Sequence, residues 1–125
     1  MKKKCVLIVE DEPIILLSAS DMVEEAGFEP ILARNAQEAI DILESRDDIS
    51  IIFTDIDMPG SMDGMKLAAA VRNRWPPIEI IITSGHKNIS QSDLPERGLF
   101  FRKPYGSQKV TQAMQRLTAG CSSPG

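Results

Sequence analysis

The sequence has little cysteine: Cys5 and Cys121 are the only two in its 125 residues. Cys5 lies in an apolar run and Cys121 in a polar tail, which indicates a small buried side chain and an incidental thiol. This placement argues against a disulfide, a metal pair or a redox role. The single histidine, His86, stands alone in a loop segment, where a surface position is a better interpretation than a phosphoryl relay.

Long apolar runs and basic clusters are also missing. No stretch approaches the ~18 apolar residues of a membrane span, and the N-terminus lacks the apolar segment of a signal peptide. The 14 basic residues are scattered, and only Lys2-Lys3-Lys4 forms a run. We therefore expect a cytoplasmic protein that binds neither membrane nor nucleic acid.

The length and composition fit one globular domain, with 42% hydrophobic residues, 26% charged residues and a net charge of −4. We expect this domain to occupy residues 1–119 and residues 120–125 to form a disordered C-terminal tail. Met1 and the polar tail are interpreted as the ends of a complete chain.

Short apolar runs rich in Ile and Val are typical of strands covered on both faces, as in a parallel sheet. Three such runs are Cys5–Val9, Ile49–Phe53 and Ile78–Ile82. Pro30–Ala33 and Leu99–Phe101 are weaker candidates for shorter or edge strands.

Helical spacing of apolar residues predicts four helices: Ile14–Ala26, Ala36–Ser45, Gly64–Arg74 and Ser107–Leu117. Pro13 suits the first turn of the first helix, and Gly27 its C-terminal end. Asn35 and Glu38 form a capping-box pattern at the second helix. Asp63 is a candidate cap for the third.

Strands that alternate with helices predict an α/β fold, a doubly wound parallel sheet of five strands. The segment His86–Arg97 is where a fourth crossover helix is expected. It is rich in Pro, Ser, Asn and Asp, so we expect that helix to be short or mobile. Ligands of such sheets bind beyond the carboxyl ends of the strands.

Polar residues with phosphoryl-transfer chemistry follow the predicted strands: Glu10, Asp11, Asp55, Thr83 and Lys103. Three carboxylates in one crevice are costly unless a cation neutralises them, and Mg²⁺ prefers such oxygen ligands. Asp55 is then a candidate nucleophile, Lys103 a mobile positive charge and Thr83 a hydrogen-bond donor. Each residue alone has an ordinary structural interpretation, and only their joint placement points to a site.

Four motifs resemble the receiver domain of two-component response regulators from about Lys3 to Leu117. They are Val6–Glu12, Thr54–Pro59 with Gly64, Ile82–Gly85 and Phe101–Tyr105. The resemblance implies a flavodoxin-like sheet with strand order 2-1-3-4-5. It also implies a stand-alone phosphorylation switch that signals by binding another protein.

The resemblance further implies specific roles. Asp55 is the phosphoryl acceptor from a histidine kinase or histidine phosphotransfer protein, and the Mg²⁺ ligands are Asp11, Asp55 and the Asp57 backbone carbonyl. Glu10 acts through a metal-bound water. The switch residues are Thr83 and Phe100, an aromatic without a hydroxyl, which must report the state by packing or else is plain edge-strand core.

The sequence departs from the family pattern in places. Glu10 replaces the more frequent Asp, and one extra residue lies between Pro59 and Gly64. Asp57 adds a carboxylate near the acceptor and Gly85 offers no side chain, so the lifetime of the phosphorylated state is not predictable.

Other functions remain open. The receiver could signal to a target, pass phosphoryl groups along a relay or act as a phosphate sink. Asp55-Ile56-Asp57 also resembles the nucleophile motif of haloacid-dehalogenase-type phosphatases, but it lies mid-chain and no acidic pair follows Lys103. A receiver-like binding module with an idle acceptor is a third possibility, against which the intact set of site residues argues.

Overall fold

The computed structural model describes residues 3–56, 64–85 and 91–122. Its sheet has five parallel strands in the order β2-β1-β3-β4-β5, which confirms the predicted fold class and strand order. The strands are β1 (Cys5–Val9), β2 (Glu29–Ala33), β3 (Ile49–Asp55), β4 (Glu79–Ser84) and β5 (Gly98–Arg102).

Four strands differ from their predicted ranges by one or two residues at an end, and two of these differences have identifiable reasons. β3 continues past Phe53 because Thr54 and Asp55 still pair with β4, Asp55 lying opposite Thr83. β4 begins after Ile78, since the Ile78 N–H donates to the Trp75 carbonyl in the preceding turn.

The helices are α1 (Pro13–Glu25), α2 (Ala36–Ser45), α3 (Gly64–Arg74) and α4 (Ser107–Ser122). The prediction of a tail from residue 120 was wrong for its first residues, because α4 continues to Ser122. The next proline, which would disfavour helix in the residue before it, comes only at position 124.

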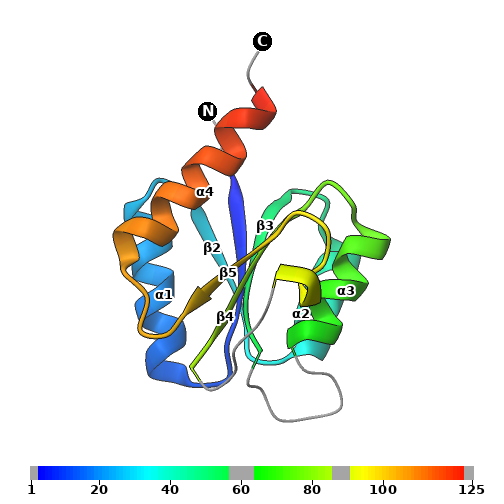
Figure 1. Cartoon of the computed structure of the whole chain (residues 1–125), viewed down its shortest axis with the longest axis horizontal. Helices are drawn as coiled ribbons and strands as arrows, with labels where there is room; N and C mark the ends of the chain where they lie inside the picture. Colours follow the sequence, from blue (N-terminus) through cyan, green and yellow to red (C-terminus); the bar gives the residue numbers. More distant parts are fainter. Residues whose placement is uncertain (1–2, 57–63, 86–90, 123–125) are drawn as a thin grey trace.

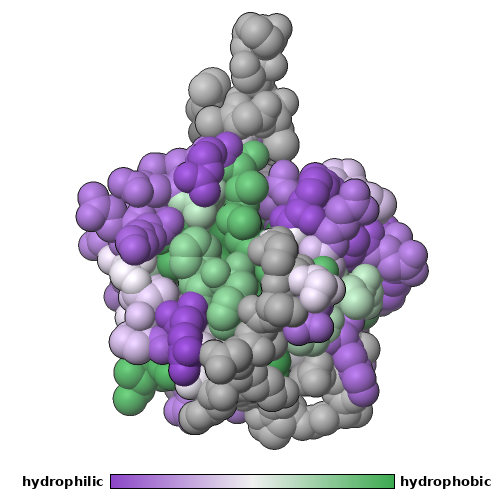
Figure 2. All heavy atoms as spheres, viewed as in Figure 1, coloured by the Kyte–Doolittle hydropathy of each residue, from purple (hydrophilic) through white to green (hydrophobic). Residues whose placement is uncertain are grey.

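The described part of the crossover between β4 and β5 contains a single 3-10 turn, η1 (Gln91–Asp93), where a helix was expected to be short. β5 is an edge strand, and Leu99, Phe100 and Phe101 are only half-buried. Figure 2 shows apolar side chains along the middle of the face on which β5 lies, between the polar surfaces of the flanking helices.

Two hydrophobic layers hold the helices against the sheet, with α1 and α4 on one face and α2 and α3 on the other (Figure 1). Alternate strand residues serve the two layers: Ile51 and Phe53 face α1 and α4, and Ile52 faces α2 and α3. The alternation follows from the pleat of a strand, and it explains why β3 is apolar throughout.

Asp63, the candidate cap of α3, lies outside the described residues, and the other helix ends follow the predicted signals with one difference. Pro13 occupies the first turn of α1, and Gly27 has the left-handed backbone (φ 97°) typical of a residue just after a helix. Asn35 caps α2, its Oδ1 accepting from the Glu38 N–H at 2.8 Å. Glu38 does not complete the capping box, because its Oε1 accepts instead from the Arg34 N–H at 2.9 Å.

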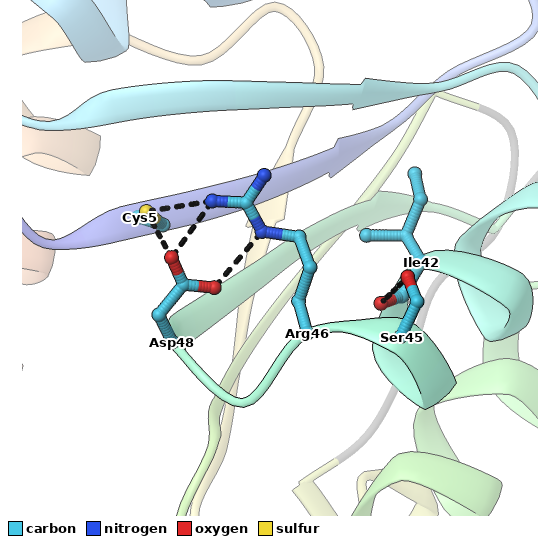
Figure 3. Close-up of polar contacts among 5 residues, drawn as sticks. All are labelled: Cys5, Ile42, Ser45, Arg46 and Asp48. Atoms are coloured by element: carbon cyan, nitrogen blue, oxygen red, sulfur yellow. Dashed lines mark hydrogen bonds and ion pairs between the residues drawn. The ribbon is translucent and has the colours of Figure 1, made fainter.

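Cys5 is buried as expected, but it is also part of a polar cluster at the start of the sheet (Figure 3). Asp48 accepts two hydrogen bonds from Arg46, of 2.9 and 2.7 Å, and its Oδ2 lies 3.6 Å from the Cys5 sulfur. The hydrogen bonding by Arg46 lowers the pKa of Asp48 to about 2. Burial, and then the Asp48 carboxylate, raise the pKa of the Cys5 thiol.

The Cys5 thiol is expected to react slowly with an alkylating reagent in the folded protein, because a raised pKa leaves less thiolate at a given pH and burial limits access. The measurement uses a Cys121→Ser background at a pH of about 8.5, near the pKa of a free thiol. The same protein in denaturant is the control. Equal alkylation rates in the two states would contradict the assigned environment.

Among the helices that the structure describes, none combines the length and apolar character needed to cross a bilayer.

Candidate phosphoryl-transfer site

Three carboxylates meet at the carboxyl end of the sheet, as the sequence predicts. Glu10 and Asp11 follow β1, and Asp55 is the last residue of β3, the strand beside it. One carboxylate oxygen from each of the three lies within 4.8 Å of the others. Glu10 and Asp55 are each only 4% exposed, so solvent screens their mutual repulsion poorly.

Lys103 directly follows β5, the edge strand beside β4, and its ammonium lies between two of these carboxylates. Its Nζ is 3.2 Å from Glu10 Oε1 and 3.2 Å from Asp55 Oδ2. The residue is held in place by its backbone, because the Lys103 N–H donates to the Ser84 carbonyl at 2.9 Å and so extends the pairing of β5 with β4.

The electrostatics of this cluster are those of a site with too much negative charge. Burial raises the pKa of Glu10, and Asp55 acts in the same direction, against the Glu12 N–H and Lys103. Burial alone would lower the pKa of Lys103, but the attraction of Asp55 and Glu10 outweighs it and the pKa is raised. One ammonium therefore does not balance the three carboxylates.

Thr83 is buried on β4 directly beside β3, in register with Asp55. The Ile56 N–H donates to the Thr83 carbonyl at 2.9 Å, so the pairing of β3 and β4 continues past Asp55. Asp55 and Thr83 also line the same small cavity. The structure thus places Thr83 where the sequence predicted it.

A cleft of about 310 Å³ opens on Asp55, and three of the residues that line it, Glu12, Ile15 and Gly85, were not among the predicted site residues. The Glu12 N–H donates to Glu10 Oε2 at 3.2 Å and orients that carboxylate. Ile15, on α1, is 37% exposed at the edge of the cleft. Glu12 directly follows Asp11 and Ile15 lies four residues after it, and this proximity is the only sequence signal for either.

Tyr105 was missed as well. Its ring packs edge-on against Phe53, with centroids 5.6 Å apart and planes at 69°. It borders the small cavity beside Asp55, and burial raises the pKa of its hydroxyl. An aromatic residue two positions after Lys103 could have been recognised as a cover for the site.

Gly64 begins α3 beside the end of β3, where a side chain has no room. A Cβ at this position would contact the Asp55 carbonyl oxygen and lie 2.7 Å from Ile56 Cα. These are backbone atoms, which cannot move aside as a flexible side chain can. The close approach therefore requires glycine.

Replacing Gly64 with alanine is expected to destabilise the domain by about 1–3 kcal/mol, the usual cost of overpacking, and to displace Asp55. Thermal unfolding and phosphoryl uptake measure the two effects. Gly106→Ala is the matched control, because a Cβ there meets nothing within 4 Å. Native-like stability of Gly64→Ala would contradict the contact.

The family model for the response regulator receiver domain matches residues 6–115. The chain belongs to this family. Receiver domains are the phosphorylation-linked switch modules of two-component response regulators, and the acidic cluster lies where such a domain binds Mg²⁺.

Curated relatives are longer proteins. An NtrX-like response regulator of Rickettsia bellii is 31% identical over 115 residues, which are 89% of this chain and 24% of the relative. The nitrogen assimilation regulatory protein NtrX of Azorhizobium caulinodans is 30% identical over 115 residues, 89% of this chain and 25% of the relative. The receiver chain spans about a quarter of the length of these two proteins.

Solved receiver structures share the fold. A receiver protein from Sinorhizobium medicae WSM419 superposes with a TM-score of 0.87 at 27% identity, covering 94% of this chain and 95% of that one. A co-crystal structure of the Saccharomyces cerevisiae phosphotransfer protein Ypd1 with the receiver domain of Ssk1 matches with a TM-score of 0.80 at 20% identity. It covers 98% of this chain and 94% of that chain, and the likeness shows the fold alone.

Two further predictions, on Asp57 and Phe100, remain predictions. Asp57, expected to offer its carbonyl to a metal, lies outside the described residues. Phe100 is half-buried and packs against the α2 and α3 layer, which fits both interpretations of its role and leaves the switch a prediction.

A larger cleft, of about 580 Å³, lies at the opposite end of the sheet, where β3 and β4 begin. Arg74 pairs with Glu44 at 2.8 Å and stacks over Trp75. The lining carries two basic residues, Arg46 and Arg74, and two acidic ones, Glu44 and Asp47. It therefore lacks the surplus charge that marks the cleft at Asp55 as the chemical site.

Proposed function

We propose that this receiver accepts a phosphoryl group on Asp55 in a Mg²⁺-dependent reaction and signals through the resulting change in its protein-binding surface. The observation that carries the proposal is the meeting of Asp55, its two acidic neighbours and Lys103 in one cleft at the carboxyl end of the sheet. The family membership supplies the reaction class.

The donor set fits Mg²⁺. Glu10, Asp11 and Asp55 offer only carboxylate oxygens, the ligands that a hard divalent cation prefers, and their surplus negative charge needs a cation beyond Lys103. We assign Asp11 and Asp55 as direct ligands with the Asp57 carbonyl, and Glu10 as a ligand through water. When bound, the ion supplies charge neutralisation for the attacking carboxylate and the phosphoryl oxygens.

The remaining chemistry belongs to this chain's own side chains. A carboxylate oxygen of Asp55 attacks the phosphorus of the donor, a bond from Asp55 to phosphorus forms, and the bond from phosphorus to the donor's nitrogen breaks. Lys103 is close enough to Asp55 to exchange part of that contact for a phosphoryl oxygen. The Thr83 hydroxyl is placed to donate to another.

Thr83 and Phe100 are the proposed switch residues. Thr83 lies in register between Asp55 and Phe101, and Phe100 precedes Phe101 on β5, opposite Ile82. In this proposal a shift of Thr83 toward the phosphoryl group is followed by an inward movement of the half-buried Phe100 ring. Phosphorylation can shift the domain toward the active state only if the phosphoryl group interacts more favourably with the active state than with the inactive one.

The proposed partners are a histidine kinase or histidine phosphotransfer protein as donor and a downstream protein as target, in the cytoplasm and without nucleic acid or membrane. Signalling to a target, relay and phosphate sink all remain consistent with this site. Family membership favours the receiver over the haloacid-dehalogenase-type phosphatase. A measurement of turnover on a small phosphate ester would distinguish these two functions.

The test is the intact mass after incubation with phosphoramidate, with Mg²⁺ and with a chelator. The proposal expects a gain of one phosphoryl group that requires Mg²⁺, followed by slow loss. No gain under either condition would replace it with an idle, binding-only receiver, and continuous turnover of a small ester would favour the phosphatase.

A further inference from the structure

Seven of the described residues line the cleft that opens on Asp55, and all but one are charged or lack a side chain. The seven are Glu10, Asp11, Glu12, Ile15, Asp55, Gly85 and Lys103. Ile15 is thus the only apolar side chain that the described residues contribute to this wall. Gly85, directly after β4, adds no side chain to the wall of the cleft.

Packing of α1 against the sheet does not explain why position 15 is an isoleucine. The residues that α1 buries against the sheet are Leu16, Ala19 and Val23. Ile15 is 37% exposed, against 82% for Ile14 and 61% for Leu17, so it lies at the boundary between the core and solvent. An isoleucine in this position keeps apolar surface in contact with water, which costs free energy roughly in proportion to its area.

Ile15 lines three hollows at this end of the sheet, two of which also include Asp55. It lines the open cleft, the small cavity that Asp55 shares with Thr83, and the groove beside Lys103 and Tyr105. Its side chain therefore lies between the solvent on the α1 side and the Asp55 carboxylate.

We propose that Ile15 limits the access of water to phosphorylated Asp55 and so lengthens the lifetime of the active state. The inference rests on the proposed function. In the step that it slows, a water oxygen attacks phosphorus and the bond from phosphorus to the Asp55 oxygen breaks. Asp55 recovers its carboxylate, inorganic phosphate leaves, and the proton of the attacking water passes to solvent or to the phosphate. An apolar side chain over the cleft lowers the local concentration of attacking water.

The experiment compares the native chain with Ile15→Ala, Ile15→Leu and Leu17→Ala. Each protein is loaded with phosphoramidate and Mg²⁺, the donor is removed, and the loss of the phosphoryl group is followed by intact mass. Ile15→Ala is expected to shorten the half-life roughly tenfold, a change of about 1.4 kcal/mol in the barrier. Ile15→Leu restores most of the lifetime. Leu17→Ala, equally apolar and on the same helix but outside the cleft, leaves it unchanged.

A second readout separates shielding from a structural effect. Hydroxylamine cleaves acyl phosphates directly, so its rate constant should rise in Ile15→Ala in step with hydrolysis, at a temperature well below the unfolding transition of every variant. Equal lifetimes in the native chain and Ile15→Ala would overturn this inference alone. Failure of the native chain to load would overturn the proposed function and the inference with it.

Discussion

The Asp55→Asn variant is expected to fold normally and to take up no phosphoryl group from phosphoramidate. Asparagine has nearly the same shape as aspartate, but its amide nitrogen and carbonyl oxygen are not the charged nucleophile that the reaction needs. The substitution also removes one of three crowded carboxylates. The unfolding temperature without Mg²⁺ should therefore be equal to or above the native value.

Asp41→Asn is a suitable control, because Asp41 is an exposed carboxylate on α2, away from the site. It should load as the native chain does. Circular dichroism and thermal unfolding establish that each variant is folded before its mass is measured. Labelling that persists in a folded Asp55→Asn protein would mean that the acceptor is another residue.

The Lys103→Ala variant should still bind Mg²⁺, with an affinity equal to or higher than the native one. Its ammonium contacts Glu10 and Asp55 at 3.2 Å each, so removing it takes away a positive charge that competes with the metal for both carboxylates. Phosphorylation by phosphoramidate should slow by roughly tenfold to a hundredfold, as when a single electrostatic contact to a transition state is lost. Coupling to the switch should fail.

Metal titration, loading rate and backbone amide shifts of Thr83 and Phe100 measure these three effects. In the native chain both amides should shift on phosphorylation, and in Lys103→Ala they should shift little. Lys109→Ala, an exposed lysine on α4, is the control for loss of one positive charge. Native-like shifts in Lys103→Ala would remove Lys103 from the switch.

The strand ends explain why the site could be predicted from the sequence. Apolar runs covered on both faces identify parallel strands, and the residues that follow them must share one edge of the sheet. Glu10, Asp55 and Lys103 were found in this way, and the structure brings them within hydrogen-bonding reach. The strand order itself came from the family resemblance, because apolar periodicity says nothing about which strands are neighbours.

Contacts between distant side chains were not predictable by the same reasoning. In the sequence, Arg72 is an ordinary basic residue near a helix end. In the structure its guanidinium donates to the carbonyls of Glu96, Pro76 and Ile78. These hydrogen bonds connect the segment before β5 to the end of α3. The position of Ile15 at the cleft was not predictable either, because helical spacing gives the face of a residue and not the depth of its side chain.

Reductive trapping of the loaded protein tests the central claim most directly. Borohydride converts an aspartyl phosphate to homoserine, which peptide mass spectrometry locates in the sequence. The account predicts homoserine at position 55 in the sample loaded with Mg²⁺ and none in the chelated sample. Homoserine at another aspartate, or none in a protein that has gained a phosphoryl group, would contradict it.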